Sequence, residues 1–581
     1  MRHCDVDLPV TLQRSQLALR ATHVPGRRMF LAAALAWAWS GCGADAPKKE
    51  EVENWAPYAD RGADAGLQWY GESISTCAFL DDLDGDGLDD AGWTLRESDG
   101  AAATLQVAWG DAPAHFGAPE FVSLAGQLPF LGCTVADLDR DGMADIVLSG
   151  FGGVSVLRQD SARQFILEFV PVDQPDTAAV VGMATIDLDR DGWPDVVAGQ
   201  ASQGHLPSGA IQCFYYVDPM DLRCAPPPGL HESLPPVILM NHAGTLVEEK
   251  ERVSTLTKTP HFTPFTVATD DFDGDGFDDA FIGVDFGVLQ FYRGTADGRL
   301  EEVALAGTAR YGHTMGSAIG DLNGDQRPDL LATDVGPVTL LLSEPGGGFR
   351  SAEVDTGVAE ATRLTVSWGA RIFDADLDGA LDAWVSVRHA FLTFGELLES
   401  AAGIMWVDAT SLGVNYSEGL DAPENDLLLM GSGGSTPTFS TLRLPDWRAV
   451  APRCIPTVAF ADVDRDGDMD ALQVYCDEAR LLINETASGG AWLELDLRGT
   501  TSNRQAIGAK VIVETAGITR RTAVGGGGGF DSWSSPVVHF GLGAAHGAAR
   551  LTISWPSGCT IIDEDFAVDR RVVIVEGEVC P

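Results

Sequence analysis

Seven short segments of this chain share the pattern D-x-[DN]-x-D-x-x-x-D, and their spacing constrains the fold more than any other sequence feature. They begin at Asp82, Asp137, Asp187, Asp271, Asp321, Asp374 and Asp462. Successive starts are 55, 50, 84, 50, 53 and 88 residues apart. A period near 50 residues is typical of a repeated structural unit, and the two long intervals fit the same unit with roughly 30 to 40 extra residues.

Apolar, β-prone residues stand on both sides of the acidic segments. Val135-Ala136 precedes the second copy, Ile146-Val147-Leu148 follows it, and a glycine-rich turn at 150–153 leads into a further short strand. Short strands and turns at even spacing predict an all-β chain. Because a four-stranded propeller blade takes about 50 residues, seven copies predict a seven-bladed β-propeller.

The repeats and a change of character after Asn484 divide the chain into four predicted parts. These are a lipoprotein-type signal peptide (1–41), a tether (42–62), a calcium-binding propeller (63–487) and a separate small β domain without the acidic motif (488–581). The two long intervals predict insertions over 199–260 and 385–452. Such loops carry function more often than core strands do.

The N-terminal region reads as an export signal. Arg27 and Arg28 precede an apolar run of 11 residues, Met29 to Trp39, which is too short to span a bilayer. Ser40-Gly41-Cys42 follows and resembles a bacterial lipobox, which predicts that Cys42 carries a lipid. An ordinary secretory signal and twin-arginine export both stay open. The expected location is the bacterial cell envelope or surface, with the membrane contacted through the lipid anchor alone.

Eight cysteines follow Cys42, and an even number in an exported protein predicts disulfides. Proximity in sequence favours three pairs and leaves one more. The predicted pairs are Cys213–Cys224, Cys454–Cys476, Cys559–Cys580 and Cys77–Cys133.

The acidic motif carries the chemistry. Carboxylates at positions 1, 3 and 5 of a tight loop converge on one point, position 6 makes the turn, position 7 offers a carbonyl and position 9 adds a carboxylate. These are the hard oxygen ligands that Ca²⁺ takes six to eight at a time. An EF-hand is excluded because its Glu at position 12 is here Trp93 in the first copy and Leu148 in the second.

We therefore predict about seven Ca²⁺ ions. The predicted ligands, by loop, are Asp82, Asp84, Asp86, Leu88 and Asp90; Asp137, Asp139, Asp141, Met143 and Asp145; Asp187, Asp189, Asp191, Trp193 and Asp195; Asp271, Asp273, Asp275, Phe277 and Asp279; Asp321, Asn323, Asp325, Arg327 and Asp329; Asp374, Asp376, Asp378, Ala380 and Asp382; and Asp462, Asp464, Asp466, Asp468 and Asp470. The fifth loop should bind most weakly, because Asn323 removes one charge, Arg327 adds an opposite one, and Gln326 stands where the turn favours Gly.

The repeats resemble FG-GAP/VCBS repeats, the blades of integrin-α-like propellers. The last 90 or so residues resemble the ASPIC/UnbV domain. The residues that carry this resemblance are 499–509, 525–530, His539-Phe540-Gly541-Leu542-Gly543 and Trp555-Pro556-Ser557-Gly558. The pair is similar to the cartilage acidic protein family, which implies extracellular calcium binding and adhesion. Gln326 and the two insertions depart from the family pattern.

Charge and motifs limit the function. A formal net charge of -47 argues against nucleic acid as a partner. No HExxH or GxSxG pattern occurs, so His313 and His539 are interpreted as structural, and Arg504 as either an ion-pair residue or a contact for an anionic glycan. The leading hypothesis is a monomeric, non-enzymatic surface module that binds a protein or glycan ligand. A carbohydrate-active lyase or hydrolase and a purely structural envelope protein are the alternatives.

Overall fold

A computed structural model describes the chain from Tyr58 onwards with internal gaps. The residues outside the description are 1–57, 68–72, 75–76, 98–102, 125–128, 162, 175–177, 203–233, 257–262, 306, 308–310, 364, 388–424, 446–456, 476–478, 487–488, 516, 526 and 581. The described residues belong to one compact unit, Asn54–Pro581. The signal peptide, Cys42 and Cys213, Cys224, Cys454 and Cys476 therefore lie outside the described residues.

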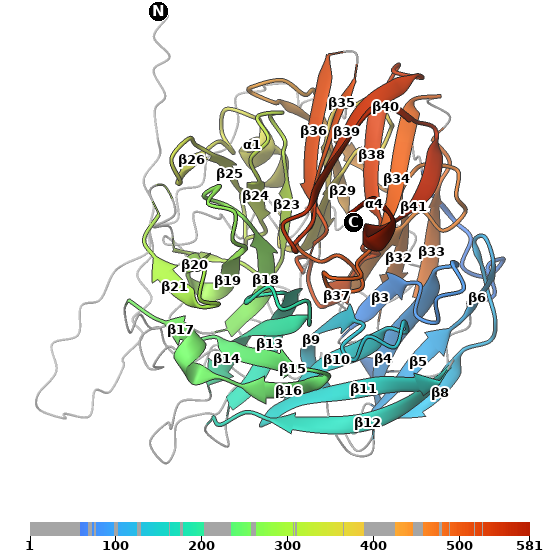
Figure 1. Cartoon of the computed structure of the whole chain (residues 1–581). Coiled ribbons are helices and arrows are strands. Elements are labelled where there is room, and N and C mark those ends of the chain that lie inside the picture. Colours follow the sequence, from blue (N-terminus) through green and yellow to red (C-terminus); the bar gives the residue numbers. More distant parts are fainter. Residues whose placement is uncertain are drawn as a thin grey trace, which may run out of the picture. The chain divides into compact units, whose positions relative to one another are not determined.

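The all-β prediction is confirmed, and seven sheets in the described part of the chain share one plan of four antiparallel strands (Figure 1). In chain order they are β3 (Ala78–Asp81), β4 (Asp90–Glu97), β5 (Ala103–Ala108), β8 (Glu120–Ser123); β9 (Pro129–Ala136), β10 (Asp145–Gly150), β11 (Gly153–Ser161), β12 (Gln164–Pro171); β13 (Ala178–Ile186), β14 (Asp195–Ser202), β15 (Val237–His242), β16 (Thr245–Glu248); β18 (Thr263–Asp270), β19 (Asp279–Val288), β20 (Gln290–Gly294), β21 (Leu300–Val303); β23 (Ser317–Gly320), β24 (Asp329–Ala332), β25 (Thr339–Ser343), β26 (Phe349–Ser351); β27 (Ser367–Phe373), β28 (Asp382–Val387), β29 (Leu427–Gly431), β30 (Phe439–Arg443); and β31 (Thr457–Ala461), β32 (Asp470–Val474), β33 (Ala479–Asn484), β1 (Tyr58–Asp60).

Several short elements pair with these sheets or lie in the connections between their strands. β2 (Ser73–Ile74) pairs with β4, β17 (Val253–Ser254) with β21, and β22 (Tyr311–His313) with β19. The hairpin β6 (Gly110–Ala112) and β7 (His115–Phe116), the 3₁₀ turn η1 (Lys250–Arg252) and the short helix α1 (Val358–Thr362) lie in connections.

The first strands of the seven sheets follow one another in a closed series. β9 contacts β13, β13 contacts β18, β18 contacts β23, and β23 contacts β27. The rings of Phe373 in β27 and Phe460 in β31 lie 5.4 Å apart, and β31 contacts β3. The disulfide Cys77–Cys133 closes the remaining junction, between the first sheet and the second. Buried aliphatic and aromatic side chains fill the space between neighbouring sheets, so each sheet buries both of its faces.

The tether prediction for 42–62 differs from the structure at its end, because β1 is the fourth strand of the seventh sheet. β1 pairs with β33 over Tyr58↔Asn484 to Asp60↔Leu482. Tyr58 is 3% exposed, donates its hydroxyl to the Met469 carbonyl at 2.9 Å, and meets the ring of Trp384 edge-on. The pairing of β1, from the N-terminal part of the chain, with β33 therefore completes the seventh sheet.

The insertion prediction also needs correction. Residues 237–248 and 427–443 belong to the third and fourth strands of the third and sixth sheets, not to loops. Leu239 and Leu428 in these strands are fully buried, which explains why the apolar runs form strands. The added segments are shorter and stand between the second and third strands, at 203–233 and 388–424.

The C-terminal residues build two further sheets. They are β38 (Val538–Gly543), β34 (Ala491–Arg498), β41 (Arg570–Val575); and β36 (Ile518–Ala523), β35 (Lys510–Thr515), β39 (Ala548–Ser554), β40 (Thr560–Ala567). The first residue of helix α4 (Glu576–Val579), Glu576, holds the turn at residues 500–502. One Glu576 oxygen accepts the N–H groups of Thr500, Thr501 and Ser502, each at 2.8 Å. These bonds, together with those from the hydroxyls of Ser502 and Ser557, hold the pKa of Glu576 at about 2, although burial raises it.

The predicted C-terminal domain packs directly on the sheets, and its residues 527–536 lie against the first strands of all seven sheets. β37 (Ser532–Trp533) pairs in parallel with β3 and contacts β9. A Cβ on Gly527 would lie 2.5 Å from Ala184 of β13, which only a glycine avoids. The other contacts are Gly528 N–H to the Val267 carbonyl in β18, Gly529 N–H to the Ser317 carbonyl in β23, Phe530 against Trp368 in β27, and Ser534 with Phe460 in β31.

Two of the four predicted disulfides fall in the described part of the chain, and both are confirmed. Cys77–Cys133 joins the first two sheets, with Cα atoms 5.6 Å apart, and Cys559–Cys580 ties the loop before β40 to the end of α4. The disulfides indicate an extracytoplasmic protein. No helix of the described residues is long and apolar enough to cross a membrane.

The pairing of β1 with β33 predicts how truncation affects stability. A chain starting at residue 63 lacks β1 and leaves β33 as an exposed edge, so its melting temperature should fall sharply. A chain starting at residue 55 keeps β1 and should melt like the full ectodomain. Calorimetry of the two truncations compares them directly, and equal melting temperatures would contradict the role of β1.

Candidate metal centres

Each acidic segment forms the loop between the first and second strands of one sheet. The first residue of every second strand is the Asp at motif position 9, from Asp90 in β4 to Asp470 in β32. Since the first strands form one closed series, the seven loops lie at the same end of the sheets. The structure thus gives each predicted loop an equivalent place in the fold.

Two residues of each loop have left-handed backbone angles. The position-6 residues are Gly87, Gly142, Gly192, Gly276, Gln326, Gly379 and Gly467, and all have positive φ. The position-4 residues Gly85, Arg140, Arg190, Gly274, Gly324, Leu377 and Arg465 do as well. The turn at position 6 was predicted from the sequence, whereas the positive φ at position 4 was not. Glycines at three of the seven position-4 sites were the available signal.

Backbone N–H groups organise the carboxylates at positions 1 and 5. The position-6 N–H donates to the position-1 Asp in all seven loops, at distances from 2.7 Å (Gly379 to Asp374) to 3.4 Å (Gly192 to Asp187). The position-7 N–H donates to the position-5 Asp at 2.7–3.2 Å. The second oxygens of Asp82 and Asp137 are buried without a hydrogen-bond partner. An orphaned carboxylate oxygen suits a metal ligand.

Among the described residues, six groups of acidic or other ligating side chains have one ligand atom each within 4.8 Å of the others and could hold a metal ion, and five of them are Asp triads in the acidic loops. These triads are Asp82, Asp84 and Asp86; Asp137, Asp139 and Asp141; Asp187, Asp189 and Asp195; Asp271, Asp273 and Asp279; and Asp374, Asp376 and Asp382. Donor sets made only of oxygen suit Ca²⁺, which prefers carboxylates and carbonyls. The residues therefore fit calcium. The ligand role of the position-7 carbonyls stays a prediction.

The Asp at position 9 has a second role that the sequence analysis missed. One of its oxygens accepts the position-2 N–H at 2.8–3.1 Å in every loop. Its other oxygen accepts an N–H at the end of the third strand, or just beyond it, at 2.7–2.9 Å. This carboxylate therefore ties the loop to the second and third strands. Its place directly before a buried strand was the only sequence signal.

Burial and mutual repulsion act on these carboxylates. Burial, and then neighbouring Asp side chains, raises the pKa of Asp90, Asp279, Asp329 and Asp382 to about 8, against the hydrogen bonds that lower it. A bound cation favours the ionised form and reverses this effect. Near neutral pH, cation binding at these four loops therefore favours loss of the proton from the position-9 carboxyl.

C-terminal side chains reach the position-1 residues of four loops. Lys510 Nζ lies 2.6 Å from Asp271, Asn503 Nδ2 lies 3.4 Å from Asp187, the Asp137 N–H donates to Gln505 at 3.0 Å, and Arg498 lies 4.0 Å from Asp82. Three further contacts reach the sixth and seventh loops: Arg520 with the Gly379 carbonyl, Gly541 against Asp374, and His539 with the Gly467 carbonyl. The C-terminal region therefore contacts six of the seven acidic loops.

Arginines at position 4 connect neighbouring loops. Arg140 donates to the Gly192 carbonyl in the third loop and lies 4.5 Å above Trp193. Arg190 lies 4.2 Å from the ring centre of Phe277 in the fourth loop. Arg465 of the seventh loop donates to a carbonyl of the first. The positive φ of these arginines at position 4 thus directs their cationic side chains toward the next loop.

The fifth loop has the features that predicted weak binding. Gln326 has φ 67°, and Arg327 pairs with Asp325, the position-5 carboxylate. Both histidines have hydrogen-bond partners: His313 contacts Asp285 at 3.1 Å, and His539 bonds to the Gly467 carbonyl at 2.8 Å. Arg504 has no ion pair among the described residues and lines a small cavity beside the first two loops.

Family comparisons agree with the sequence resemblance. Residues 137–198 and 271–332 match the FG-GAP-like repeat, and residues 499–580 match the ASPIC and UnbV family. The chain therefore carries FG-GAP-like repeats followed by a C-terminal ASPIC/UnbV domain. No curated protein matches the chain significantly.

Several solved structures resemble it distantly. An Agrocybe aegerita lectin is 15% identical with a TM-score of 0.36, over 74% of this chain and 90% of that chain. The BP39L lectin of Burkholderia pseudomallei is 10% identical with a TM-score of 0.42, over 72% and 97%. The rhamnogalacturonan lyase YesW is 13% identical with a TM-score of 0.37, over 74% and 76%. At these values the likeness does not extend to any ligand or activity.

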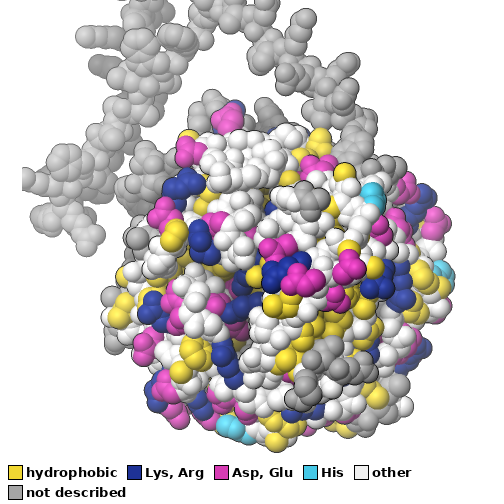
Figure 2. All heavy atoms as spheres, turned by 45° about the horizontal axis from the view of Figure 1, so that its top comes forward, with side chains coloured by type: hydrophobic (Ala, Val, Ile, Leu, Met, Phe, Trp, Pro, Cys, Tyr) yellow, Lys and Arg dark blue, Asp and Glu magenta, His cyan; other side chains and the backbone are white. Residues whose placement is uncertain are grey.

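The visible surface in Figure 2 shows Lys and Arg side chains scattered among Asp and Glu. This face has no continuous basic patch of the kind that binds a polyanion.

Reciprocal substitutions at position 6 test the strain in the fifth loop. Gln326→Gly should raise the free energy of unfolding by about 1 kcal/mol, because Gly adopts positive φ without strain. Gly142→Gln, the matched change in the second loop, should lower it by a similar amount. Urea denaturation in calcium measures both, and a destabilised Gln326→Gly variant would contradict this account.

Proposed function

We propose that the seven sheets are the blades of one closed β-propeller and that each acidic loop holds one Ca²⁺, about seven in all. The closed series of first strands and the segment 527–536 at their meeting point support the propeller. The Asp triads and the orphaned oxygens of Asp82 and Asp137 support the ions.

We propose that calcium is structural in this protein. When bound, the ion neutralises converging carboxylates, and the position-9 Asp transmits the loop geometry to the third strand. An ion that binds only the folded state stabilises it by about 2.7 kcal/mol at a hundredfold excess over Kd. Several such sites make calcium a folding ligand.

We propose a binding or adhesion module as the role, with a protein or glycan as ligand. The observation that carries this proposal is the asymmetry between the two ends of the sheets. At one end the C-terminal region contacts six of the seven acidic loops. The strand ends that border residues 203–233 and 388–424 lie at the other end, because they join second to third strands. The two longest connections of the sheets therefore leave from the end opposite the acidic loops.

We propose that the protein is a monomeric surface lipoprotein anchored through Cys42, and not an enzyme. The extracytoplasmic setting indicated by the disulfides supports the location. The hydrogen bonds of His313 and His539, which hold both rings in structural roles, support a binding function.

Calcium removal tests the structural role. EDTA should lower the melting temperature sharply, and added Ca²⁺ should restore it. Calorimetric titration of partly chelated protein should show one weaker class of site, which Asp325→Ala removes, whereas Asp139→Ala damages folding. An unchanged melting temperature in EDTA would refute calcium as a folding ligand.

Binding is tested on glycan and protein arrays with the calcium-loaded ectodomain. Residues 205–232 and residues 390–422 are each replaced by a short Gly-Ser linker in separate variants. At least one of the two replacements should abolish the ligand signal, and both should leave calcium-dependent melting intact. Ile562→Ser, on the exposed face of β40, is the control and should bind normally. Binding that survives both replacements would place the ligand elsewhere.

A further inference from the structure

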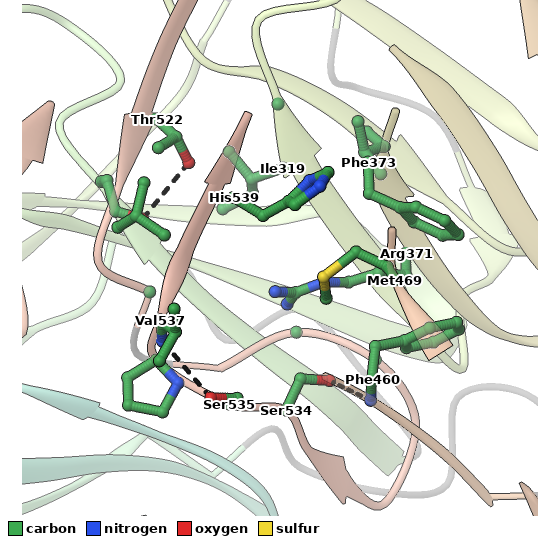
Figure 3. A pocket seen from close by; sticks show the side chains of 18 of the residues that line it. Ile319, Arg371, Phe373, Phe460, Met469, Thr522, Ser534, Ser535, Val537 and His539 are labelled. Carbon is green, nitrogen blue, oxygen red and sulfur yellow. Dashed lines mark hydrogen bonds between the residues drawn. The ribbon is translucent and has the colours of Figure 1, made fainter. Parts of the chain in front are cut away.

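A cavity of about 100 Å³ lies between the C-terminal region and the fifth, sixth and seventh sheets (Figure 3). Arg371 reaches into it from β27, and His539 points toward it from β38. Ser534 and Ser535 close another side, and the apolar walls include Phe460. Segments far apart in the sequence thus enclose one small space.

The charges that line this cavity have one sign. Arg371, Arg520, Arg521 and His539 line it, and no Asp or Glu does. Two of the arginines are already engaged, Arg521 with Asp270 and Arg520 with the Gly379 carbonyl. In a chain with a net charge of -47, a cavity whose charged lining residues, among those described, are all arginines calls for an explanation.

Arg371 is the cation without a counter-charge. It has no ion pair and no side-chain hydrogen bond to any residue that the structure describes. Burial alone lowers the pKa of its guanidinium to about 10. Arg371 is half-buried, and an anion between its N–H donors supplies the partner that the protein does not.

Neighbouring groups can complete an anion site. The Ser534 hydroxyl accepts the Phe460 N–H at 3.1 Å, so its own proton can point to a ligand. His539 donates from Nε2 to the Gly467 carbonyl at 2.8 Å, and burial lowers its pKa to about 4. The imidazole is therefore neutral at pH 7, which leaves Arg371 as the charge that selects the ligand.

We propose that this cavity binds a small oxyanion, sulfate-sized or a carboxylate, through a charge-assisted contact with Arg371. The volume excludes large ligands, and the lack of acidic lining residues removes competitors for the guanidinium. Because the cavity lies between the C-terminal region and three sheets, a bound anion holds them together. This site is independent of the surface ligand proposed above.

The test titrates calcium-loaded protein with sodium sulfate and, separately, sodium acetate, at ionic strength matched with sodium chloride. One of these anions should bind at one site per chain by calorimetry and raise the melting temperature above that in chloride. Arg371→Met should weaken this binding about tenfold or more. Sulfate binding indicates an inorganic oxyanion, and acetate binding a carboxylate.

Two controls keep the test decisive. Without added oxyanion, Arg371→Met should be at least as stable as the wild type, because it removes a half-buried charge that has no acidic partner. Arg350→Met changes an exposed arginine outside the cavity and should bind like the wild type. No binding of either anion, or equal binding by Arg371→Met, would overturn the proposal.

Discussion

Repulsion between carboxylates that converge in one loop is the constraint on which the rest of this structure depends. Backbone N–H groups hold the Asp side chains in place but do not cancel their charge, and burial makes the repulsion stronger. A cation resolves it. Because the position-9 carboxylate bonds to the loop and to the third strand, as Asp145 does through Leu138 and Gln159, the state of each loop sets the geometry of its whole sheet.

The C-terminal region contacts the acidic loops directly. Its side chains contact position-1 residues or position-6 carbonyls, and its segment 527–536 lies where the first strands meet. Arg521 and Asp270 form a buried pair that joins β36 to the end of β18. Loss of the proposed calcium ions should therefore loosen both the sheets and the C-terminal region that contacts them. The Arg371 cavity lies between the same C-terminal region and the fifth, sixth and seventh sheets.

Much of this organisation could be predicted. The seven loops, their position-6 turn, the all-β class and the pairs Cys77–Cys133 and Cys559–Cys580 all follow from local patterns and spacing. The predictions that failed were about long-range pairing. β1 was assigned to a tether, and residues 237–248 and 427–443 to loops, because nothing near those strands in the sequence shows which strand they join.

The sequence by itself determined the chemistry of each loop, because ligand identity and spacing within nine residues are local properties. Only the tertiary structure decided which oxygens stay free for a metal, since the second oxygens of Asp82 and Asp137 are orphaned by burial and not by sequence. Likewise Arg371 is an ordinary strand arginine in the sequence. Its place in a cavity without acidic lining residues arises because residues about 150 positions away in the sequence, from 520 to 541, form the other side of the cavity.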